Sequence, residues 1–172
     1  MSRVSVRLEP VSPVEYETFI EAQIAEFADQ KVRAGHWRAE DARELSRHAV
    51  EGFLPRRGPT SGHRVWKAVD GSGKRVGWIW VGPSPLKHLD EPSKRWLYQI
   101  TIEVSHRGQG YGRAALTAAE AILAAEGVKD LYLNVFRWNT VARSLYDASG
   151  YRVVYDGETE TGMIKTLAST EE

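Results

Sequence analysis

The segment from Val104 to Leu116, VSHRGQGYGRAAL, restricts the fold of this chain more than any other stretch. Three glycines alternate there with other residues, after the β-branched and aromatic stretch WLYQITIEV (residues 96–104) and before an alanine-rich run. The pattern predicts a buried strand, a glycine loop and a helix from about Gly110 to Glu126. The later stretch LYLNVF (residues 131–136) is typical of another strand. Strand, helix and strand in this order predict two parallel strands joined by a right-handed crossover.

The start of this predicted helix lacks the usual capping residue. Ser, Thr, Asp or Asn normally binds the free backbone N–H groups of a first turn, whereas glycines stand here. Free N–H groups, the helix dipole and the flanking Arg107 and Arg113 favour a phosphate site, with a simple tight turn as the alternative. No Lys-Ser/Thr pair follows Gly112, so the loop is no P-loop, and Gly108, Gly110 and Gly112 lack the spacing of a dinucleotide fingerprint.

The rest of the chain predicts further strands and helices around this unit. The expected elements are a strand near Val4–Leu8, helices over Pro13–Gln30, Arg38–Phe53 and Asn139–Ser149, a hairpin of HRVWKAV and RVGWIWVG, and a closing hairpin of YRVVYDG and TGMIKTL. This order, β-α-α-β-β-β-α-β-α-β-β, predicts an α/β fold with a mixed sheet and helices on both faces. A chain of 172 residues without a long linker predicts one domain over residues 1–172.

The composition excludes several kinds of chemistry. The 23 basic and 23 acidic residues give a net charge of zero, which argues against general affinity for nucleic acid or membrane. The absence of cysteine excludes disulfides, cysteine-based zinc sites and a cysteine acyl-enzyme. The five histidines show no metal-ligand spacing, so we expect no metal. No stretch approaches roughly 18 apolar residues and the start lacks a signal-peptide pattern, so we expect a cytoplasmic protein.

Two motifs resemble one known family. Arg107, Gly110 and Gly112 fit the pattern Arg-x-x-Gly-x-Gly. The segment NTVARSLYDASGY (residues 139–151) fits Asn-x-x-Ala-x-x-Leu-Tyr-x-x-x-Gly-Tyr/Phe. In these features the chain resembles the GNAT superfamily of N-acetyltransferases, which transfer the acetyl group of acetyl-CoA to an amine. The specific resemblance covers Trp96 to Val154, and the residues before Trp96 carry no motif that matches.

The resemblance implies a mostly antiparallel central sheet that splays apart between its two parallel strands, with the thioester of acetyl-CoA in the gap. It implies that the strand Ile102–Val104 pairs with the pantetheine arm and that the loop Arg107–Arg113 holds the pyrophosphate. It also implies that Asn139 faces the cofactor and that Tyr146 approaches its sulfur. The cofactor-binding residues carried over in this way are Ile102, Glu103, Val104, Arg107, Gly108, Gln109, Gly110, Tyr111, Gly112, Arg113, Asn139, Ala142 and Tyr146.

Acetyl transfer needs proton transfers, because a typical alkyl amine is protonated at pH 7 and the leaving thiolate can take up a proton. The hydroxyl group of Tyr146 is the candidate acid, and an ordinary half-buried helix tyrosine is the alternative. Glu103, at the predicted strand end beside the thioester, is the first candidate for the base, and a solvated carboxylate is the alternative. Gln99 stands where relatives often have an acidic residue. A water chain ending on Glu103, or on a residue of the first half, would serve equally.

The function that follows is direct acetyl transfer to an amine in a ternary complex. An acyltransferase for a longer acyl-CoA and a non-catalytic acyl-CoA-binding or regulatory domain stay open as alternatives. The sequence does not identify the acceptor, which can be a small amine, amino acid, antibiotic, peptide N-terminus or lysine side chain, and it is compatible with a homodimer. Trp66, Trp78 and Trp80 are expected in the core or on a sheet face, with Trp80 near a strand end that an acceptor pocket could use.

Overall fold

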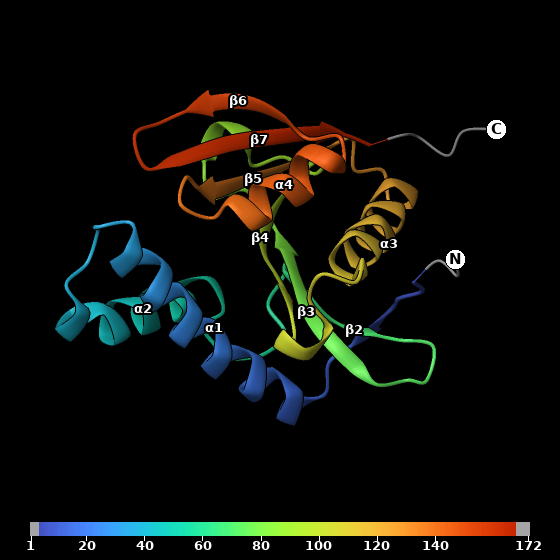
Figure 1. Cartoon of the computed structure of the whole chain (residues 1–172), viewed down its shortest axis with the longest axis horizontal. Coiled ribbons are helices and arrows are strands. Elements are labelled where there is room, and N and C mark those ends of the chain that lie inside the picture. The colour runs from blue at the N-terminus through green and yellow to red at the C-terminus, as the bar shows by residue number, and fades with distance from the viewer. Residues whose placement is uncertain (1–3, 168–172) are drawn as a thin grey trace.

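The computed structural model describes residues 4–167 and has the predicted order of elements (Figure 1). The strands are β1 (Arg7–Pro10), β2 (Arg64–Val69), β3 (Arg75–Gly82), β4 (Lys94–Ile102), β5 (Asp130–Phe136), β6 (Arg152–Asp156) and β7 (Glu160–Thr166). The helices are α1 (Pro13–Arg33), α2 (Ala39–Phe53), α3 (Tyr111–Ala125) and α4 (Thr140–Ala148), with two short 3₁₀ turns at Lys87–Leu89 and Val104–His106. None of the described helices is long and apolar enough to span a membrane. The predicted α/β class is confirmed.

The seven strands form one sheet in the order β1-β2-β3-β4-β5-β7-β6. Every neighbouring pair is antiparallel except β4 and β5, which run parallel. The parallel pairing covers only Lys94–Trp96 on β4 and Asp130–Tyr132 on β5, so the two strands separate beyond these residues. The sheet is therefore splayed between its parallel strands, as the resemblance implies, and the edge of β4 that faces β5 is unpaired from Leu97 onward.

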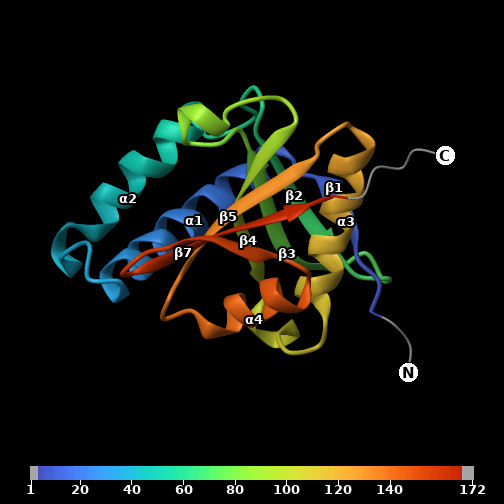
Figure 2. The same cartoon turned by 90° about the horizontal axis from the view of Figure 1, so that it is seen from above.

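The helices cover both faces of the sheet (Figure 2). On one face, Phe19, Ile20 and Ile24 of α1 pack with Trp78 and Trp80 of β3. On the other face, apolar residues of α3 and α4 pack against the sheet; they include Leu116, Leu123 and Tyr146, together with Ile79, Leu131 and Trp66 from the strands. All three tryptophans are buried, as predicted. Removing a side chain such as Leu116 would cost about 2–5 kcal/mol of stability.

Local sequence fixes where α1 begins. Ser12 caps the helix: its hydroxyl accepts a hydrogen bond from the backbone N–H of Glu15, and the Glu15 carboxylate accepts one from the backbone N–H of Ser12. Pro13 occupies the first turn, where its missing N–H group costs nothing. Lys67 of β2 also binds the Glu15 carboxylate. The start of α1 is thereby attached to the sheet, and the helix carries its later residues across the gap between β4 and β5.

Several boundaries differ from the sequence predictions. Strand β1 begins at Arg7 rather than Val4, and α1 continues to Arg33 rather than ending at Gln30. Strand β4 ends at Ile102, because the chain turns into a 3₁₀ turn from Val104 to His106. Glu103 and Val104 of the predicted pairing segment Ile102–Val104 therefore lie beyond the end of β4, and the pairing of this segment with the pantetheine arm stays a prediction.

Strand β4 also contains a bulge. Trp80 of β3 faces Gln99 and Val81 faces Leu97, which leaves Tyr98 as an extra residue between them. Bulges of this kind bend a strand and redirect side chains, and they are frequent beside functional sites. The bulge lies at the point where β4 has already separated from β5.

Candidate active site

The glycine loop leaves the start of α3 without a side-chain cap. Gly110 is the N-cap residue, with φ of +92°, and Gly108 has φ of +72°. Both values lie in the left-handed region, which glycine adopts without strain. The backbone N–H groups of residues 108–113 have no acceptor in the described part of the chain. The helix start is therefore bare, as the sequence predicts, and its positive dipole end faces outward.

A groove of about 920 Å³ runs along this bare helix start. Its walls come from the glycine loop, the end of β4, the second half of α1 and the first turns of α4. From these elements the lining includes Arg107, Gly108, Gly110, Tyr111, Gly112 and Arg113; Ile100, Thr101 and Ile102; Glu26, Asp29, Gln30 and Arg33; and Trp138, Asn139, Thr140, Val141, Ala142 and Leu145. Arg107 folds back on β4, because its Nε donates a hydrogen bond to the Ile102 carbonyl at 2.8 Å. The groove thus combines the glycine loop and the end of β4 with side chains of α1 and α4.

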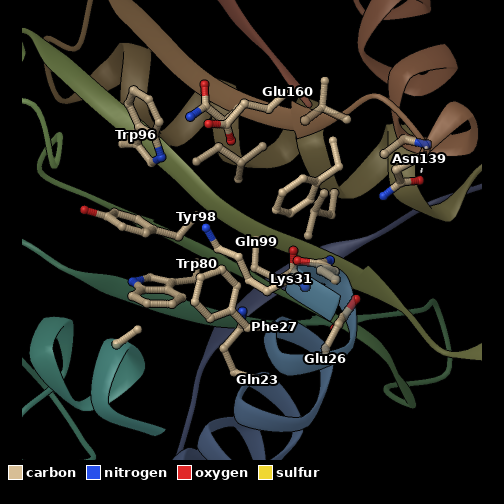
Figure 3. Close-up of a pocket in the computed structure, with 18 of the residues that line it drawn as sticks. Gln23, Glu26, Phe27, Lys31, Trp80, Trp96, Tyr98, Gln99, Asn139 and Glu160 are labelled. Carbon is tan, nitrogen blue, oxygen red and sulfur yellow. Dashed lines mark hydrogen bonds between the residues drawn. The ribbon is translucent and has the colours of Figure 1, made fainter. Parts of the chain in front are cut away.

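A second cavity, of about 330 Å³, occupies the gap between the splayed strands (Figure 3). Seven aromatic side chains contribute to its walls: Phe27, Phe53, Trp80, Trp96, Tyr98, Phe136 and Tyr146. Trp80 and Tyr98 stack at one end, with ring centroids 4.5 Å apart, and Glu26 and Asn139 lie at the other end. The indole of Trp80 donates to His63, and the hydroxyl of Tyr98 donates to the Pro83 carbonyl. These hydrogen bonds fix both rings in place.

The groove and the inner cavity meet. Both are lined by Glu26, Gln30, Ile100, Asn139 and Ala142, and Tyr146 lines the inner cavity beside them. The two cavities are therefore adjacent, with these five residues at their boundary. Ala142 leaves space there because its side chain is a single methyl group.

Two ionisable groups lie at this junction. Tyr146 is 7% exposed, and burial together with the nearby charge of Glu26 raises the pKa of its hydroxyl group. The hydroxyl makes no hydrogen bond within residues 4–167, so it is free to donate one. The Glu26 carboxylate accepts a hydrogen bond from the Thr101 hydroxyl at 3.0 Å. Burial raises the pKa of Glu26, and this hydrogen bond acts in the opposite direction.

Most of the residues implied by the resemblance lie along the groove, but Glu103, Val104, Gln109 and Tyr146 do not, and of these four Tyr146 lines the inner cavity instead. Gln109 is exposed, and its amide donates to the Ser105 carbonyl. Val104 is 76% exposed and lies beyond the end of β4. Asn139 does line both cavities, and its side chain also caps α4 by accepting a hydrogen bond from the Ala142 N–H at 3.2 Å.

Glu103 does not occupy the position expected of it. It follows the last residue of β4, and it lines neither the groove nor the inner cavity. Its carboxylate lies 3.3 Å from the Arg75 guanidinium, which also lies over the ring of Trp78. The backbone N–H of Glu103 still bonds to the Val76 carbonyl of β3, and its side chain pairs with Arg75 of the same strand instead of entering either cavity. The structure therefore places the first candidate base outside the site.

Sequence reasoning missed Glu26. Gln23, Glu26 and Gln30 follow one another at spacings of three and four residues, so they share one face of α1, and all three line the inner cavity. This polar stripe lies beside the apolar stripe of Phe19, Ile20 and Ile24. A polar stripe next to a buried apolar one was the signal that could have identified the residue.

The comparisons with known proteins decide the family. The model of the acetyltransferase (GNAT) family matches residues 21–151, which is most of the chain. The chain belongs to the GNAT family of acetyltransferases. GNAT enzymes transfer an acyl group from acyl-CoA to an amine, and this chain is accordingly an acyltransferase.

Two Bacillus subtilis relatives support this membership. The chain is 30% identical to N-acetyltransferase YycN over 164 residues, which cover 95% of this chain and 100% of YycN. It is 31% identical to N-acetyltransferase YdgE over 144 residues, covering 84% of this chain and 90% of YdgE.

Solved structures support the GNAT fold. The crystal structure of YycN superposes with a TM-score of 0.83 at 29% identity, covering 90% of this chain and 97% of that one. The PaiA N-acetyltransferase of Thermoplasma acidophilum, solved in complex with coenzyme A, superposes with a TM-score of 0.69. It is 20% identical and covers 94% of this chain and 99% of its own, a similarity that extends to the fold alone.

Proposed function

We propose that this GNAT enzyme is an acetyl-CoA-dependent N-acetyltransferase that transfers the acetyl group directly to an amine in a ternary complex. The observation that carries the proposal is the junction of the groove and the inner cavity at Glu26, Asn139 and Ala142, beside Tyr146. The groove suits the donor, acetyl-CoA, and the inner cavity suits the acceptor amine. The acetyl group would reach the acceptor at the junction without an intermediate on the protein.

The bare start of α3 suits the pyrophosphate of the coenzyme. The free N–H groups of residues 108–113 and the helix dipole both favour an anion, and Arg107 and Arg113 line the same groove. The glycines let the backbone approach the phosphate oxygens closely. The residues present therefore fit the group that the family requires.

The unpaired edge of β4 suits the pantetheine arm. From Leu97 to Ile102 this edge makes no pairs with β5, so its backbone groups can bind an extended chain as a further strand would. Ile100, Thr101 and Ile102 line the groove. The proposed pairing segment is therefore Ile100–Ile102, two residues earlier than the sequence predicts.

Tyr146 is the proposed acid. Its raised pKa keeps the hydroxyl group protonated at neutral pH, so that it can donate a proton to the leaving thiolate. A matched substitution tests this role, because Tyr146→Phe removes only the hydroxyl group. We expect kcat to fall by about 100-fold, with unchanged affinity for coenzyme A in calorimetry. An unchanged kcat in the folded variant would remove the assignment.

A thiol-release assay on the wild type tests the function itself. We expect turnover with acetyl-CoA for at least one member of an amine panel, and lower kcat/KM with butyryl-CoA and longer donors, because the acyl chain would occupy the inner cavity. A higher kcat/KM with the longer donors would favour a longer-chain acyltransferase. Tight binding of acetyl-CoA without turnover of any amine would favour the non-catalytic alternative.

A further inference from the structure

Glu26 is a cavity carboxylate without an ion pair in the described part of the chain. We propose that Glu26 binds the ammonium group of the acceptor and accepts its proton before the amine attacks, a role that rests on the acetyl transfer proposed above. The location supports this role, since Glu26 is one of five residues that line both the donor groove and the inner cavity. A group at this junction can touch the reacting nitrogen.

Glu26 and Tyr146 act on the same junction from different elements. Glu26 comes from α1, on one face of the sheet, and Tyr146 comes from α4, which packs with α3. The charge of Glu26 contributes to the raised pKa of Tyr146, so the two groups are close enough to interact. This arrangement provides a carboxylate for the amine and a hydroxyl group for the sulfur.

The proton transfers balance with these two groups. The protonated amine gives one proton to the Glu26 carboxylate, and its nitrogen then forms a bond to the acetyl carbon as the carbon–sulfur bond breaks. The Tyr146 hydroxyl gives its proton to the departing sulfur and recovers one from the new amide nitrogen. Glu26 afterwards releases its proton to water. The products are the amide, the free thiol and one proton.

The inner cavity also indicates the class of acceptor. Glu26 and Glu160 are its two carboxylates, and Lys31 is its single cation among the residues described. The Lys31 ammonium already lies 5.4–5.8 Å from the ring centroids of Phe27, Trp37 and Phe136. The remaining walls are mostly aromatic and aliphatic, and the volume of about 330 Å³ is at the small end for ligand sites. The acceptor that fits is a primary amine on a compact apolar body.

A substitution series with kinetics tests the role of Glu26. In Glu26→Gln we expect kcat/KM to fall by about 100-fold or more, with unchanged affinity for coenzyme A. Glu26→Asp, which keeps a carboxylate one methylene shorter, should retain part of the rate. The matched control is Glu17→Gln on the solvent side of the same helix, whose carboxylate pairs with Arg57. Glu103→Gln is measured in parallel as the rival base.

The pH profile separates a catalytic role from a structural one. Besides Thr101, the charged or titratable groups around Glu26 are Asp29 of α1, Arg107 of the loop and Tyr146 of α4, with Lys31 and Glu160 in the same cavity. As the pH falls through the raised pKa of Glu26, kcat/KM of the wild type should decrease. Glu26→Gln should lose this acidic limb, whereas Glu26→Asp and Glu17→Gln should keep it.

The possible results distinguish a failure of the role of Glu26 from a failure of the proposed function. The inference about Glu26 fails if the wild type is active and Glu26→Gln keeps the wild-type kcat/KM and the acidic limb of the pH profile. It also fails if Glu103→Gln is the variant that loses this limb. In both cases the proposed acetyl transfer stands. If the wild type acetylates no amine, the proposed function fails.

The acceptor class is tested with 2-phenylethylamine, hexylamine, glutamate and an alanine tripeptide as acceptors. A higher kcat/KM for either of the first two supports it, and a higher value for glutamate or the tripeptide overturns it.

Discussion

The donor groove and the inner cavity are built in different ways. Half of the residues that line the groove come from one stretch of the chain, which comprises the end of β4, the glycine loop and the start of α3, and the other half come from α1 and α4. The inner cavity is formed by side chains from α1, α2, β3, β4, β5, β7 and α4, which lie far apart in the sequence. The part of the groove that consecutive residues form leaves a local motif that can be read from the sequence. A cavity of dispersed side chains leaves no such motif.

The two regions should therefore respond differently to substitution. Substitutions in the glycine loop should change the affinity for coenzyme A alone. Substitutions in the aromatic walls should change the KM of the acceptor alone. Residues at the junction should affect the chemical step. The predictions below test this separation in order of decreasing effect.

Of the three substitutions that follow, Gly110→Val should produce the largest effect, on the donor side. Gly110 has φ of +92°, a conformation that a β-branched residue adopts only with strain of about 1–3 kcal/mol. We expect the affinity for coenzyme A, measured by calorimetry, to fall at least about tenfold. The control is Gly127→Val at the other end of α3, where φ is +90° and a Cβ would meet no atom within 4 Å. An equal loss of coenzyme A affinity in both variants, or no loss in Gly110→Val, would contradict the expected separation between the donor groove and the inner cavity.

Trp80→Phe should affect the acceptor side. Trp80 is 2% exposed and stacks on Tyr98 in the wall of the inner cavity. The smaller ring weakens this stack, worth about 0.5–1.5 kcal/mol, and loses the hydrogen bond to His63, so the KM of the acceptor should rise by about 3- to 10-fold while coenzyme A affinity stays unchanged. Trp66→Phe is the control, since Trp66 is similarly buried but packs on the opposite face. A change in coenzyme affinity for Trp80→Phe alone would show that the two regions are coupled.

Thr101→Val should produce the smallest effect, at the junction. The Thr101 hydroxyl donates to Glu26 and lowers its pKa, so the substitution should raise that pKa further. The acidic limb of kcat/KM should then move to higher pH by less than about one unit. Thr117→Val, on the exposed side of α3, is the control. If the acidic limb of kcat/KM in Thr101→Val stays at the wild-type pH or moves to lower pH, Glu26 is not the titrating group.

The sequence was sufficient for the fold and for the backbone part of the site. Periodicity and turn residues predicted the order of elements, and the uncapped glycine segment predicted the bare start of α3. These features depend on neighbouring residues, which the sequence displays directly. The splay between β4 and β5 came from the resemblance, since no local pattern indicates where two strands separate.

The sequence was insufficient where tertiary contacts decide a residue's position. Glu103 was expected beside the thioester, but its carboxylate pairs with Arg75 of β3 instead. Glu26 reaches the site because α1 crosses the gap between the strands, and a helix's path over a sheet cannot be read from its own residues. The acceptor side was unreadable for the same reason, since Trp80 and Tyr98 meet only through a bulge in β4.

The most direct measurement is a crystal structure of the chain with coenzyme A. The account predicts the diphosphate on the N–H groups of residues 108–113, the arm along Ile100–Ile102 and the sulfur at the junction near Tyr146 and Glu26. A diphosphate bound away from the start of α3, or a sulfur that does not reach the junction, would contradict it.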